Sequence, residues 1–437
     1  MFEPLYTADE MKAAEAGHDV DAMMQRAGRA VAEAILHRYP DAHRVALYAG
    51  KGANGGDGWI AADILRGEGR DIVHERPELV IDGLLGTGLN GAPREETARA
   101  IEEINAFGVP VVAVDVPSGV NASTGEVAGA AVSAELTVTM HARKIGLDVA
   151  PGRFHAGDVV VGDIGVEHAE TRHRLVTRKI LELVPRKRAQ DNKYSAGSVL
   201  VVGGARGMTG AATLAARAAF RADAGYVAIA APRESLPVLE TLVVEAVKRP
   251  LDDVLDASKR SGALAIGPGL GRDRGDLVRR LLSETALPAV VDADALYELE
   301  PFERDAPTVL TPHSGELARL LGTDSGWVDA HRLEALAQAV ERFRCVVLLK
   351  GADTLVGAPG AGVLVIGGDA PQLATAGTGD VLTGIAAAFL AKRMEPQLAA
   401  AAAATAHRVA AERAGATRGL VAADVVEALP EALDAPL

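Results

Sequence analysis

Residues 50–58, GKGANGGDG, decide the fold, because they join an apolar run at residues 44–48 to a helical pattern that begins at about Trp59. The run predicts a buried strand, and the loop contains G-x-G-x-x-G from Gly50 to Gly55. That string is a weak signal alone and a stronger one between a strand and a helix. Its glycines let the backbone approach a phosphate and present amides at a helix N-terminus. A tight turn without a ligand is the alternative.

The alternation of strands and helices continues on both sides of this loop. We expect residues 1–40 to be helical, starting from the capping-box pair Thr7 and Glu10. Strands alternating with helices predict a mostly parallel sheet covered on both faces. Further strands are expected at residues 79–81, 111–114, 136–139 and 159–161, with a helix over residues 95–106.

A second alternating series begins at residues 198–202, after a polar segment at residues 167–190. The sequence therefore predicts an α/β protein with two tandem domains, residues 1–170 and 178–437. The second series has expected strands at residues 227–230, 263–266, 289–291, 308–310 and 346–349, a hairpin of residues 354–356 and 363–366, and helices from Thr213, over residues 381–393 and over residues 396–414.

The composition limits the functions open to the chain. Its 437 residues suffice for two or three domains of roughly 150 residues each. Hydrophobic residues make up 49%, which excludes disorder as the main state. The net charge of −14 argues against nucleic acid as a main partner. The single cysteine, Cys345, excludes a disulfide framework and a Cys-rich zinc site, and we expect it to be a buried strand thiol.

We expect neither an export signal nor a membrane span. Residues 1–11 carry Glu3, Asp9 and Glu10 and lack a basic-then-apolar pattern. The longest apolar stretches, residues 385–391 and 398–406, are shorter than the ~20 residues that a spanning helix needs. These features predict a cytoplasmic protein.

Three loops of the first half follow strands and carry polar residues, starting at Gly50, Asp82 and Asp115. Loops after parallel strands gather at the carboxyl edge of the sheet, where ligands bind. Asn54, Asp82 and Ser118 are therefore expected to converge, and their oxygens suit a cation held against a phosphate or a carboxamide. A single Asp at a strand end is more often a helix cap, but three such loops in one domain favour a ligand site.

In the second half, phosphate chemistry is expected at residues 376–384, AGTGDVLTG, since no Walker A string occurs. Glycines before a helix leave amides free to stabilise a phosphoryl group, and Asp380 beside them is suited to take a proton from an attacking hydroxyl. A helix start with an incidental Asp is the alternative. We expect His313 to contact a ligand, because its loop is one of several that follow strands, at residues 203–212, 267–271, 292–296, 311–316 and 350–354.

The loops of the first half resemble the amino-terminal domain of NAD(P)HX epimerases, a Rossmann-like three-layer α/β/α fold. The resemblance implies a potassium ion on Asn54, Asp82 and Ser118, and a catalytic role for Asp115. This chain has Ala53 where the family has a first asparagine, and its connection from Asp57 to Asp82 is short for the family. The residues implied to contact the damaged nucleotide are Asn54, Gly55, Gly56, Asp57, Gly86, Thr87, Gly88 and Asp115.

Residues 190–430 resemble the ribokinase-like domain of ADP/ATP-dependent NAD(P)HX dehydratases, with several strings in the family's order. The family usually begins this domain with His-Lys, where this chain has Asn192 and Lys193, a departure that we expect to be tolerated. The resemblance implies that the hydrate contacts Ala211, Gly269, His313 and Asp380. It implies that the adenine nucleotide contacts Lys350, Gly351, Ala352, Asp353, Thr354, Gly377 and Gly379.

Together the two resemblances imply a repair enzyme for NADH and NADPH hydrated at carbon 6 of the nicotinamide ring. The first domain would interconvert the R and S hydrates, by opening and reclosing the carbinolamine centre. The second would phosphorylate the S hydrate, with Asp380 as base, and phosphate would then leave. The implied cofactors are K⁺, Mg²⁺ and ADP or ATP, with ADP expected to give AMP and phosphate. A homo-oligomer is expected.

Two alternatives stay open. In the first alternative, the carboxyl-terminal domain is a small-molecule kinase of the ribokinase class that releases a stable phosphorylated product. In the other, the amino-terminal domain is a non-catalytic binding or assembly module. The set of Asn54, Asp82, Asp115 and Ser118 argues against the second alternative, while Ala53 and the short connection from Asp57 to Asp82 argue weakly for it.

Overall fold

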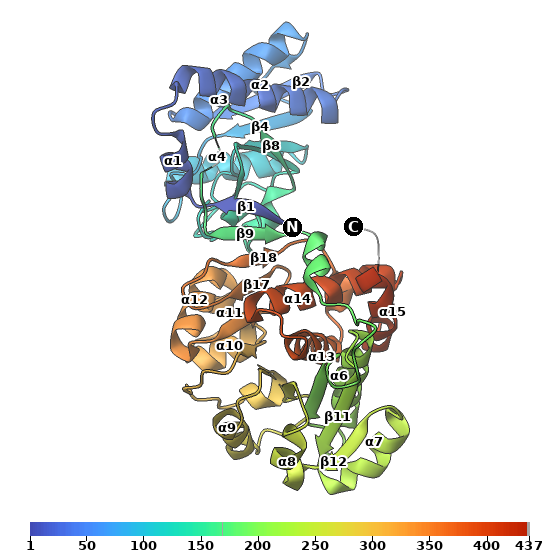
Figure 1. Cartoon of the computed structure of the whole chain (residues 1–437). Coiled ribbons are helices and arrows are strands. Elements are labelled where there is room, and N and C mark those ends of the chain that lie inside the picture. The colour runs from blue at the N-terminus through green and yellow to red at the C-terminus, as the bar shows by residue number, and fades with distance from the viewer. Residues whose placement is uncertain (168, 435–437) are drawn as a thin grey trace. The chain divides into compact units, whose positions relative to one another are not determined.

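The structure, a computed structural model, describes residues 1–167 and 169–434. The chain divides into two compact units, both of mixed α/β structure (Figure 1). The N-terminal unit comprises Pro4–Arg174 and Asp329–Leu333, and the C-terminal unit comprises Met1–Glu3, Leu175–Val328 and Glu334–Leu437. The expected fold class, two tandem α/β domains, is confirmed.

The N-terminal unit is built on a parallel sheet with the strand order β3-β2-β4-β5-β6-β8. The strands are β2 (Arg44–Ala49), β3 (Asp71–Ile72), β4 (Leu79–Gly83), β5 (Val111–Val114), β6 (Leu136–Met140) and β8 (Asp158–Gly162). The helices are α1 (Ala8–Glu15), α2 (Val20–Arg38), α3 (Ala53–Gly67), α4 (Glu95–Ala106) and α5 (Arg153–Ala156).

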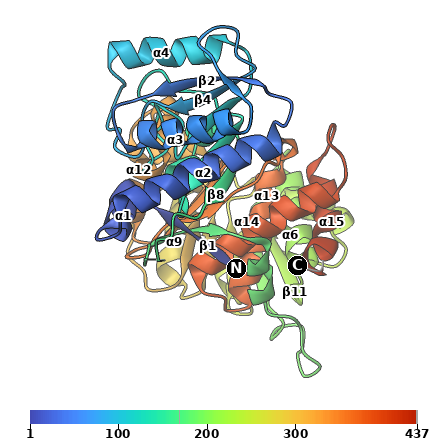
Figure 2. The same cartoon turned by 90° about the horizontal axis from the view of Figure 1, so that it is seen from above.

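Helices cover both faces of this sheet, as the alternating pattern predicted (Figure 2). On one face, Val31 of α2 and Leu65 of α3 pack with strand residues such as Ile81. On the other, Ile101 and Ile104 of α4 form a separate buried cluster with the opposite side chains of the same strands. Because successive strand residues point to opposite faces, the continuous apolar runs supply both cores.

Two expectations for the first sixty residues were wrong. Residues 1–40 do not form only helix, because Phe2–Tyr6 form strand β1, which pairs with β7 (Arg143–Lys144). A five-residue strand whose partner is so distant in sequence leaves no local pattern to detect. Helix α3 begins at Ala53 and not at Trp59, so most of the glycine string is helical. The glycines allow close packing: a Cβ on Gly56 would lie 2.2 Å from Met24 Cε.

The C-terminal unit has the strand order β12-β11-β10-β13-β14-β15-β16-β17-β18. Strands are parallel through β16, and the predicted hairpin is confirmed as the antiparallel pair β17 and β18. The strands are β10 (Ser198–Val202), β11 (Tyr226–Ala231), β12 (Val247–Pro250), β13 (Ala263–Ile266), β14 (Ala289–Val291), β15 (Thr308–Leu310), β16 (Val346–Leu349), β17 (Thr354–Gly357) and β18 (Leu364–Ile366). Strand β9 (His173–Val176) lies at the boundary of the two units.

The largest core of this unit packs around α13, which is buried along most of its length. The alanine run of α14 is buried too, so close helix packing accounts for its composition. None of the helices in the described ranges is long and apolar enough to span a membrane. The helices are α6 (Thr209–Arg221), α7 (Leu236–Leu242), α8 (Val254–Ser258), α9 (Gly275–Glu284), α10 (Ser314–Leu321), α11 (Ser325–Ala330), α12 (Arg332–Phe343), α13 (Thr378–Ala391), α14 (Pro396–Arg413) and α15 (Ala422–Asp434).

Candidate functional site

Three loops of the N-terminal unit meet at the ends of strands β4 and β5. The carboxylate of Asp82 accepts hydrogen bonds from Ser118 Oγ at 2.6 Å and from Ser118 N at 2.8 Å. The Asn54 side-chain amide donates to Leu85 O at 2.9 Å and to Val114 O at 2.6 Å. The structure thus brings Asn54, Asp82 and Ser118 into one hydrogen-bonded group.

This group fits a monovalent cation. Asp82 is fully buried, and no Lys, Arg or His of the described residues forms an ion pair with it. Burial raises the pKa of Asp82 to about 6, although the hydrogen bonds from Ser118 oppose the shift. A buried carboxylate without a cationic partner is costly, and a bound cation offsets that cost. The oxygens of Asp82, Ser118 and Asn54 are hard ligands of the kind that an alkali cation takes.

The loop with Gly86, Thr87 and Gly88 lies beside this group and is partly accessible. A Cβ on Gly86 would lie 2.6 Å from Asn54 Oδ1, so this position requires glycine. A Cβ on Gly88 would meet no atom within 4 Å, which leaves the loop open on that side. The structure therefore places the predicted nucleotide-contacting loop next to the predicted cation ligands.

Asp115 is held in a fixed position by a buried lysine. Its Oδ1 accepts hydrogen bonds from Lys144 Nζ at 2.5 Å, from Met140 N at 3.0 Å and from Thr139 Oγ1 at 3.2 Å. Lys144 has no exposed surface and also donates to Met140 O at 2.7 Å. Asp115 adopts φ of +65°, which is unusual for a residue with a side chain and typical of functional sites.

Lys144 was not among the predicted site residues. A lysine between a strand and an apolar turn is an ordinary surface pattern. Only the pairing of β7 with β1 and the approach of Asp115 show that this lysine is internal.

Two further carboxyl groups face the Asp115–Lys144 pair. Asp57 of α3 is buried, with 7% of its surface exposed, and burial together with Asp115 and Glu15 raises its pKa to about 7. Glu15, at the end of α1, has its pKa raised by burial and by Asp115, with Lys144 opposing. These four groups form one electrostatically coupled cluster, which we call the N-terminal charge cluster.

In the C-terminal unit, the Gly377–Asp380 string forms the first turn of α13. Gly377 is the N-cap residue with φ of +89°, and a Cβ there would lie 2.7 Å from Leu214 Cδ1. The hydroxyl of Thr378 donates to the carbonyls of Leu373 and Thr375, each at 2.8 Å. Thr378 N donates to Thr375 O at 3.4 Å and Val381 N to Gly377 O at 3.2 Å, which leaves the amides of Gly379 and Asp380 to bind an anion.

Lys350, from the loop after β16, lies at the same turn. Its Nζ donates to Asp292 Oδ1 at 2.7 Å, and Asp292 Oδ2 accepts from Thr383 Oγ1 at 2.6 Å. A Cβ on Gly379 would lie 3.6 Å from Lys350 Nζ, so the ammonium group lies beside the first turn of the helix. Burial acts to lower the pKa of Lys350, but Asp292, Glu316 and Asp380 outweigh it and raise that pKa.

Asp380 lies among like charges. Burial, Asp292 and, by smaller amounts, Asp294 and Glu316 together raise its pKa to about 7, while Lys350 opposes the shift. Three carboxyl groups, Asp292, Glu316 and Asp380, act on Lys350. Their negative charges would repel the phosphates of a nucleotide. Because Mg²⁺ typically binds one or two carboxylates together with substrate phosphates, this donor set fits a magnesium–nucleotide complex.

Asp292 and Thr383 are site residues that sequence analysis did not assign. Asp292 stands in one of the loops that follow strands, and this was the available signal. Its pairing with Lys350 joins positions 58 residues apart and could not be inferred from spacing.

His407 of α14 is a further residue that the sequence did not single out. It stands in the alanine-rich run, whose composition indicates only packing. Burial lowers its pKa to about 4, while the backbone of Thr378 opposes this shift. The ring is therefore neutral near pH 7.

The remaining predicted residues of this unit lie in two places. A Cβ on Gly269 would lie 3.2 Å from Ala211 Cβ, so these two predicted substrate residues are adjacent. His313 is the N-cap of α10: its Nδ1 accepts from Gly315 N at 3.0 Å, and Glu316 closes a capping box. Its exposed ring therefore has a structural role, and ligand contact stays a prediction.

The segment Lys350, Gly351, Ala352, Asp353 and Thr354 connects β16 to β17. Gly351 and Ala352 are exposed, whereas Asp353 is fully buried. Lys350 places one end of this segment at the first turn of α13. The predicted nucleotide residues Gly377 and Gly379 belong to that turn.

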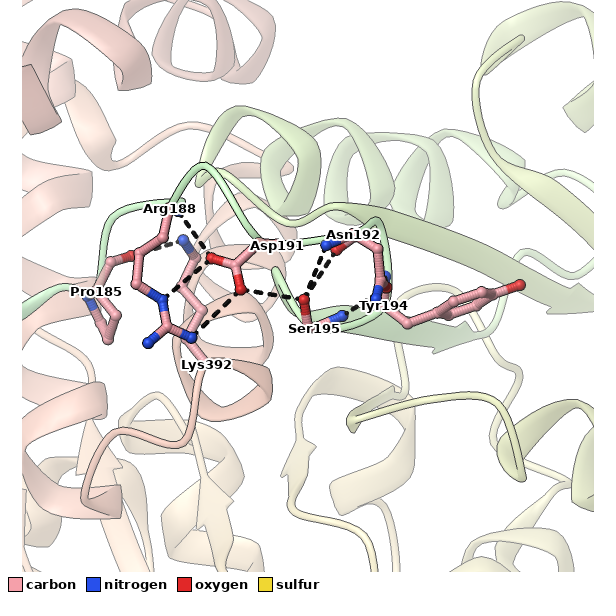
Figure 3. Close-up of polar contacts among 7 residues, drawn as sticks. All are labelled: Pro185, Arg188, Asp191, Asn192, Tyr194, Ser195 and Lys392. Atoms are coloured by element: carbon pink, nitrogen blue, oxygen red, sulfur yellow. Dashed lines mark hydrogen bonds and ion pairs between the residues drawn. The ribbon is translucent and has the colours of Figure 1, made fainter.

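Asn192, which stands where the family usually has histidine, lies in an ordered turn (Figure 3). Asn192 Oδ1 accepts hydrogen bonds from Tyr194 N at 2.9 Å and from Ser195 N at 3.2 Å. Asp191 accepts from Arg188 N at 2.8 Å and from Ser195 Oγ at 3.1 Å. Asparagine stabilises such turns through its side-chain oxygen, which accounts for this residue here.

Comparison with known families accounts for both units. Residues 199–431 match the family model described as NAD(P)H-hydrate dehydratase. Residues 20–74 and 68–146 match the model described as YjeF-related protein N-terminus. The second match falls into two pieces that overlap at residues 68–74, which include the two-residue strand β3.

Individual relatives agree with these matches. The bifunctional NAD(P)H-hydrate repair enzyme Nnr of Moorella thermoacetica is 36% identical, over 94% of this chain and 92% of the relative. The Nnr enzyme of Escherichia coli strain K12 is 32% identical, over 93% of this chain and 88% of the relative. The crystal structure of the ADP/ATP-dependent NAD(P)H-hydrate dehydratase of Bacillus subtilis, co-crystallized with ATP/Mg²⁺, has a TM-score of 0.54 and 28% identity, over 59% of this chain and 96% of that one. The chain belongs to the family of bifunctional NAD(P)H-hydrate repair enzymes.

Proposed function

We propose that this protein returns hydrated NADH and NADPH to the active coenzymes. The N-terminal unit interconverts the R and S hydrates, and the C-terminal unit dehydrates the S hydrate at the expense of a nucleotide. The observation that carries the proposal is that one chain matches both family models and has, in each unit, an Asp–Lys pair beside a carboxyl group whose pKa is raised to about 7. Carboxyl groups with a pKa near the working pH suit proton transfer.

In the C-terminal unit, Asp380 takes the proton from the hydroxyl at carbon 6 of the S hydrate. The freed oxygen attacks the terminal phosphoryl group of the nucleotide, and the bond from that phosphorus to the bridging oxygen breaks. The free amides of the first turn of α13 and the ammonium group of Lys350 face the negative charge that develops. Ala211, Gly269 and His313 are proposed to contact the hydrate.

The phosphorylated hydrate then loses phosphate. The C6–O bond breaks with its electron pair going to phosphate, while the lone pair of the ring nitrogen forms a C6=N1 bond. Loss of the proton on carbon 5 restores the dihydropyridine ring. The reaction therefore leaves no phosphorylated organic product other than the spent nucleotide.

The nucleotide is proposed to occupy Lys350 to Thr354 together with Gly377 and Gly379. With ADP as donor, the products are AMP and phosphate. Mg²⁺, when bound, neutralises phosphate charge during transfer, and the carboxyl groups around Lys350 are suited to hold it.

In the N-terminal unit, the hydrate is proposed to lie against Asn54 to Asp57 and the loop of Gly86 to Gly88. Asp115 takes the proton of the carbinolamine hydroxyl through Oδ2, because all the hydrogen bonds that described residues donate to its carboxylate reach Oδ1. K⁺ at Asn54, Asp82 and Ser118 supplies a positive charge beside the bound nucleotide when it is present. The open Gly86–Gly88 loop gives the substrate access.

The proposal extends to self-association in the cytoplasm, without a nucleic-acid partner. Exposed apolar residues from α7 to the start of the edge strand β12 support self-association: Val238, Leu242, Val244 and Val247. The net charge of −14 disfavours binding to phosphate backbones. Light scattering of the purified chain measures the oligomeric state directly.

The test of function is the conversion of purified R and S hydrates, followed by chromatography, with ADP or ATP in parallel. Loss of the S hydrate with appearance of NADH supports the dehydratase, and conversion of R to S without nucleotide supports the epimerase. A phosphorylated small molecule that accumulates instead of NADH would favour the kinase alternative.

A further inference from the structure

Asp57 differs from the other charged groups of the N-terminal charge cluster in having a buried oxygen without a hydrogen-bond partner among the described residues. Its Oδ1 is buried, and none of the described residues donates a hydrogen bond to it. The residue itself is 7% exposed and belongs to the second turn of α3. A buried carboxyl oxygen without a partner costs free energy, so a functional explanation is required.

The proposed epimerisation needs an acid as well as a base. When the carbinolamine opens, the hydroxyl loses a proton and the ring nitrogen must gain one. Asp115 is ion-paired with Lys144 and is suited to the base role. Lys144 is poorly suited to the acid role, because it has no exposed surface and donates to Asp115 Oδ1, Thr139 Oγ1 and Met140 O.

We propose that Asp57 is the general acid of epimerisation, donating a proton to the ring nitrogen while Asp115 accepts the hydroxyl proton. The C6–N1 bond breaks with its electron pair going to nitrogen, and the C6–O bond becomes a carbonyl. Rotation about the C5–C6 bond presents the other face of the aldehyde. Nitrogen then adds to it, returning its proton to Asp57, while Asp115 returns the other proton to oxygen. No proton is gained or lost overall.

The charged groups that face Asp57 favour its protonated form. Burial, Asp115 from the loop after β5, and Glu15 from α1 together raise its pKa to about 7. Lys144 couples to Glu15 and is held by Asp115. Because the acid must carry its proton, we expect the epimerisation rate to fall as the pH rises through about 7.

The first test is Asp57→Asn in the full-length chain, since asparagine keeps the shape but cannot transfer a proton. We expect R-to-S conversion to fall about 10²- to 10⁴-fold. Dehydration of pure S hydrate by the same chain, and the melting temperature in potassium chloride, should match wild type and show that both units remain folded. The inference rests on the proposed epimerase function, so wild-type conversion is measured first.

The second test separates an acid from a structural residue through the pH profile. Glu15→Gln removes one of the negative charges that raise the pKa of Asp57, so the alkaline limb of the profile should move to lower pH while the maximal rate is retained. Asp9→Asn removes the same charge from an exposed position of α1 and should leave the limb in place.

The outcomes are distinct. A wild-type chain that does not epimerise overturns the proposed function. Epimerisation by wild type together with undiminished turnover of Asp57→Asn overturns the inference alone. An alkaline limb that is the same in Glu15→Gln and Asp9→Asn also contradicts the acid role. A shift that is seen in Glu15→Gln and not in Asp9→Asn supports it.

Discussion

The two units place similar groups at their sites but use them differently. The N-terminal unit pairs Lys144 with Asp115 at 2.5 Å, and the C-terminal unit pairs Lys350 with Asp292 at 2.7 Å. Beside each pair is another aspartate whose pKa is raised to about 7, Asp57 in one unit and Asp380 in the other. Burial is the main cause of both shifts.

The two units differ in whether the ion-paired aspartate has an oxygen to which no described residue donates a hydrogen bond. Asp292 is bonded at both oxygens, to Lys350 and to Thr383, and so acts as a support. Asp115 receives its hydrogen bonds from described residues at Oδ1, which leaves Oδ2 for a substrate proton. We propose that an oxygen to which no described residue donates, and not the ion pair itself, distinguishes a carboxylate that takes up a proton from one that holds other groups in place.

The largest expected effect is at Asp380, the proposed base of the C-terminal site. Asp380→Asn should lower the rate of dehydration about 10²- to 10⁴-fold, because the amide cannot accept the hydroxyl proton. Nucleotide binding, measured by calorimetry, should persist. Turnover close to the wild-type rate would contradict the role of Asp380 as the base. It would also contradict the proposed similarity between the two sites.

Replacing Asp115 tests whether the N-terminal unit is catalytic at all. Asp115→Ala should abolish R-to-S conversion while the S hydrate is still dehydrated by the same chain. The change leaves Lys144 buried without its carboxylate, so Asp115→Asn and a thermal melt serve as controls for folding. Conversion that survives in both variants would favour the assembly-module alternative.

The cation site should affect epimerisation more modestly. Asp82→Asn removes the buried carboxylate of the group, and we expect the concentration of K⁺ needed for half-maximal epimerisation to rise about 10- to 100-fold. Dehydration should keep its wild-type rate. A wild-type epimerisation rate that does not depend on the concentration of K⁺ would contradict the assignment of Asn54, Asp82 and Ser118 as K⁺ ligands.

The pH dependence should differ in sign between the two activities. Asp380 must be ionised to act as a base, and its pKa is raised to about 7, so dehydration should weaken as the pH falls through that value. Epimerisation should weaken in the opposite direction, because Asp57 must be protonated. Both pH profiles are measured on one preparation of the protein. Rates of dehydration and epimerisation that change in the same direction with pH would contradict the roles assigned to Asp380 and Asp57.

The smallest effect is expected at Asn192, a departure from the family pattern. Asn192→Ala removes the acceptor of two backbone hydrogen bonds and should lower the free energy of unfolding by about 1 kcal/mol. Asn192→Asp keeps that acceptor and should be near neutral. Equal denaturation midpoints of the alanine variant and wild type would show that the turn is maintained by other contacts.

Much of the fold could be predicted because its signals are local. Apolar runs such as residues 198–202 and 263–266 became strands, and the capping pair Thr7 and Glu10 does begin a helix. Strand β1 was missed, since its partner Arg143–Lys144 is far away in the chain. The start of α3 was misplaced because glycines normally disfavour a helix, whereas here they permit its close packing.

The candidate site was predictable only as far as the loops. The expectation that strand-end loops carry polar residues pointed to Asn54, Asp82 and Asp115, and the glycine string before a helix pointed to Asp380. The partners were not visible, because Lys144 reaches Asp115 and Thr383 reaches Asp292 only through tertiary packing. Burial, which gives Asp57 and Asp380 a pKa of about 7, likewise has no counterpart in the local sequence.

The most direct test mixes the purified protein with both epimers of hydrated NADH, Mg²⁺, K⁺ and either ADP or ATP. The recovery of NADH is followed by its near-ultraviolet absorbance. The account predicts complete recovery with at least one nucleotide, much faster than spontaneous epimerisation allows. Recovery that stops when the S epimer is consumed would contradict the role given to the N-terminal unit, and no recovery with either nucleotide would contradict the account as a whole.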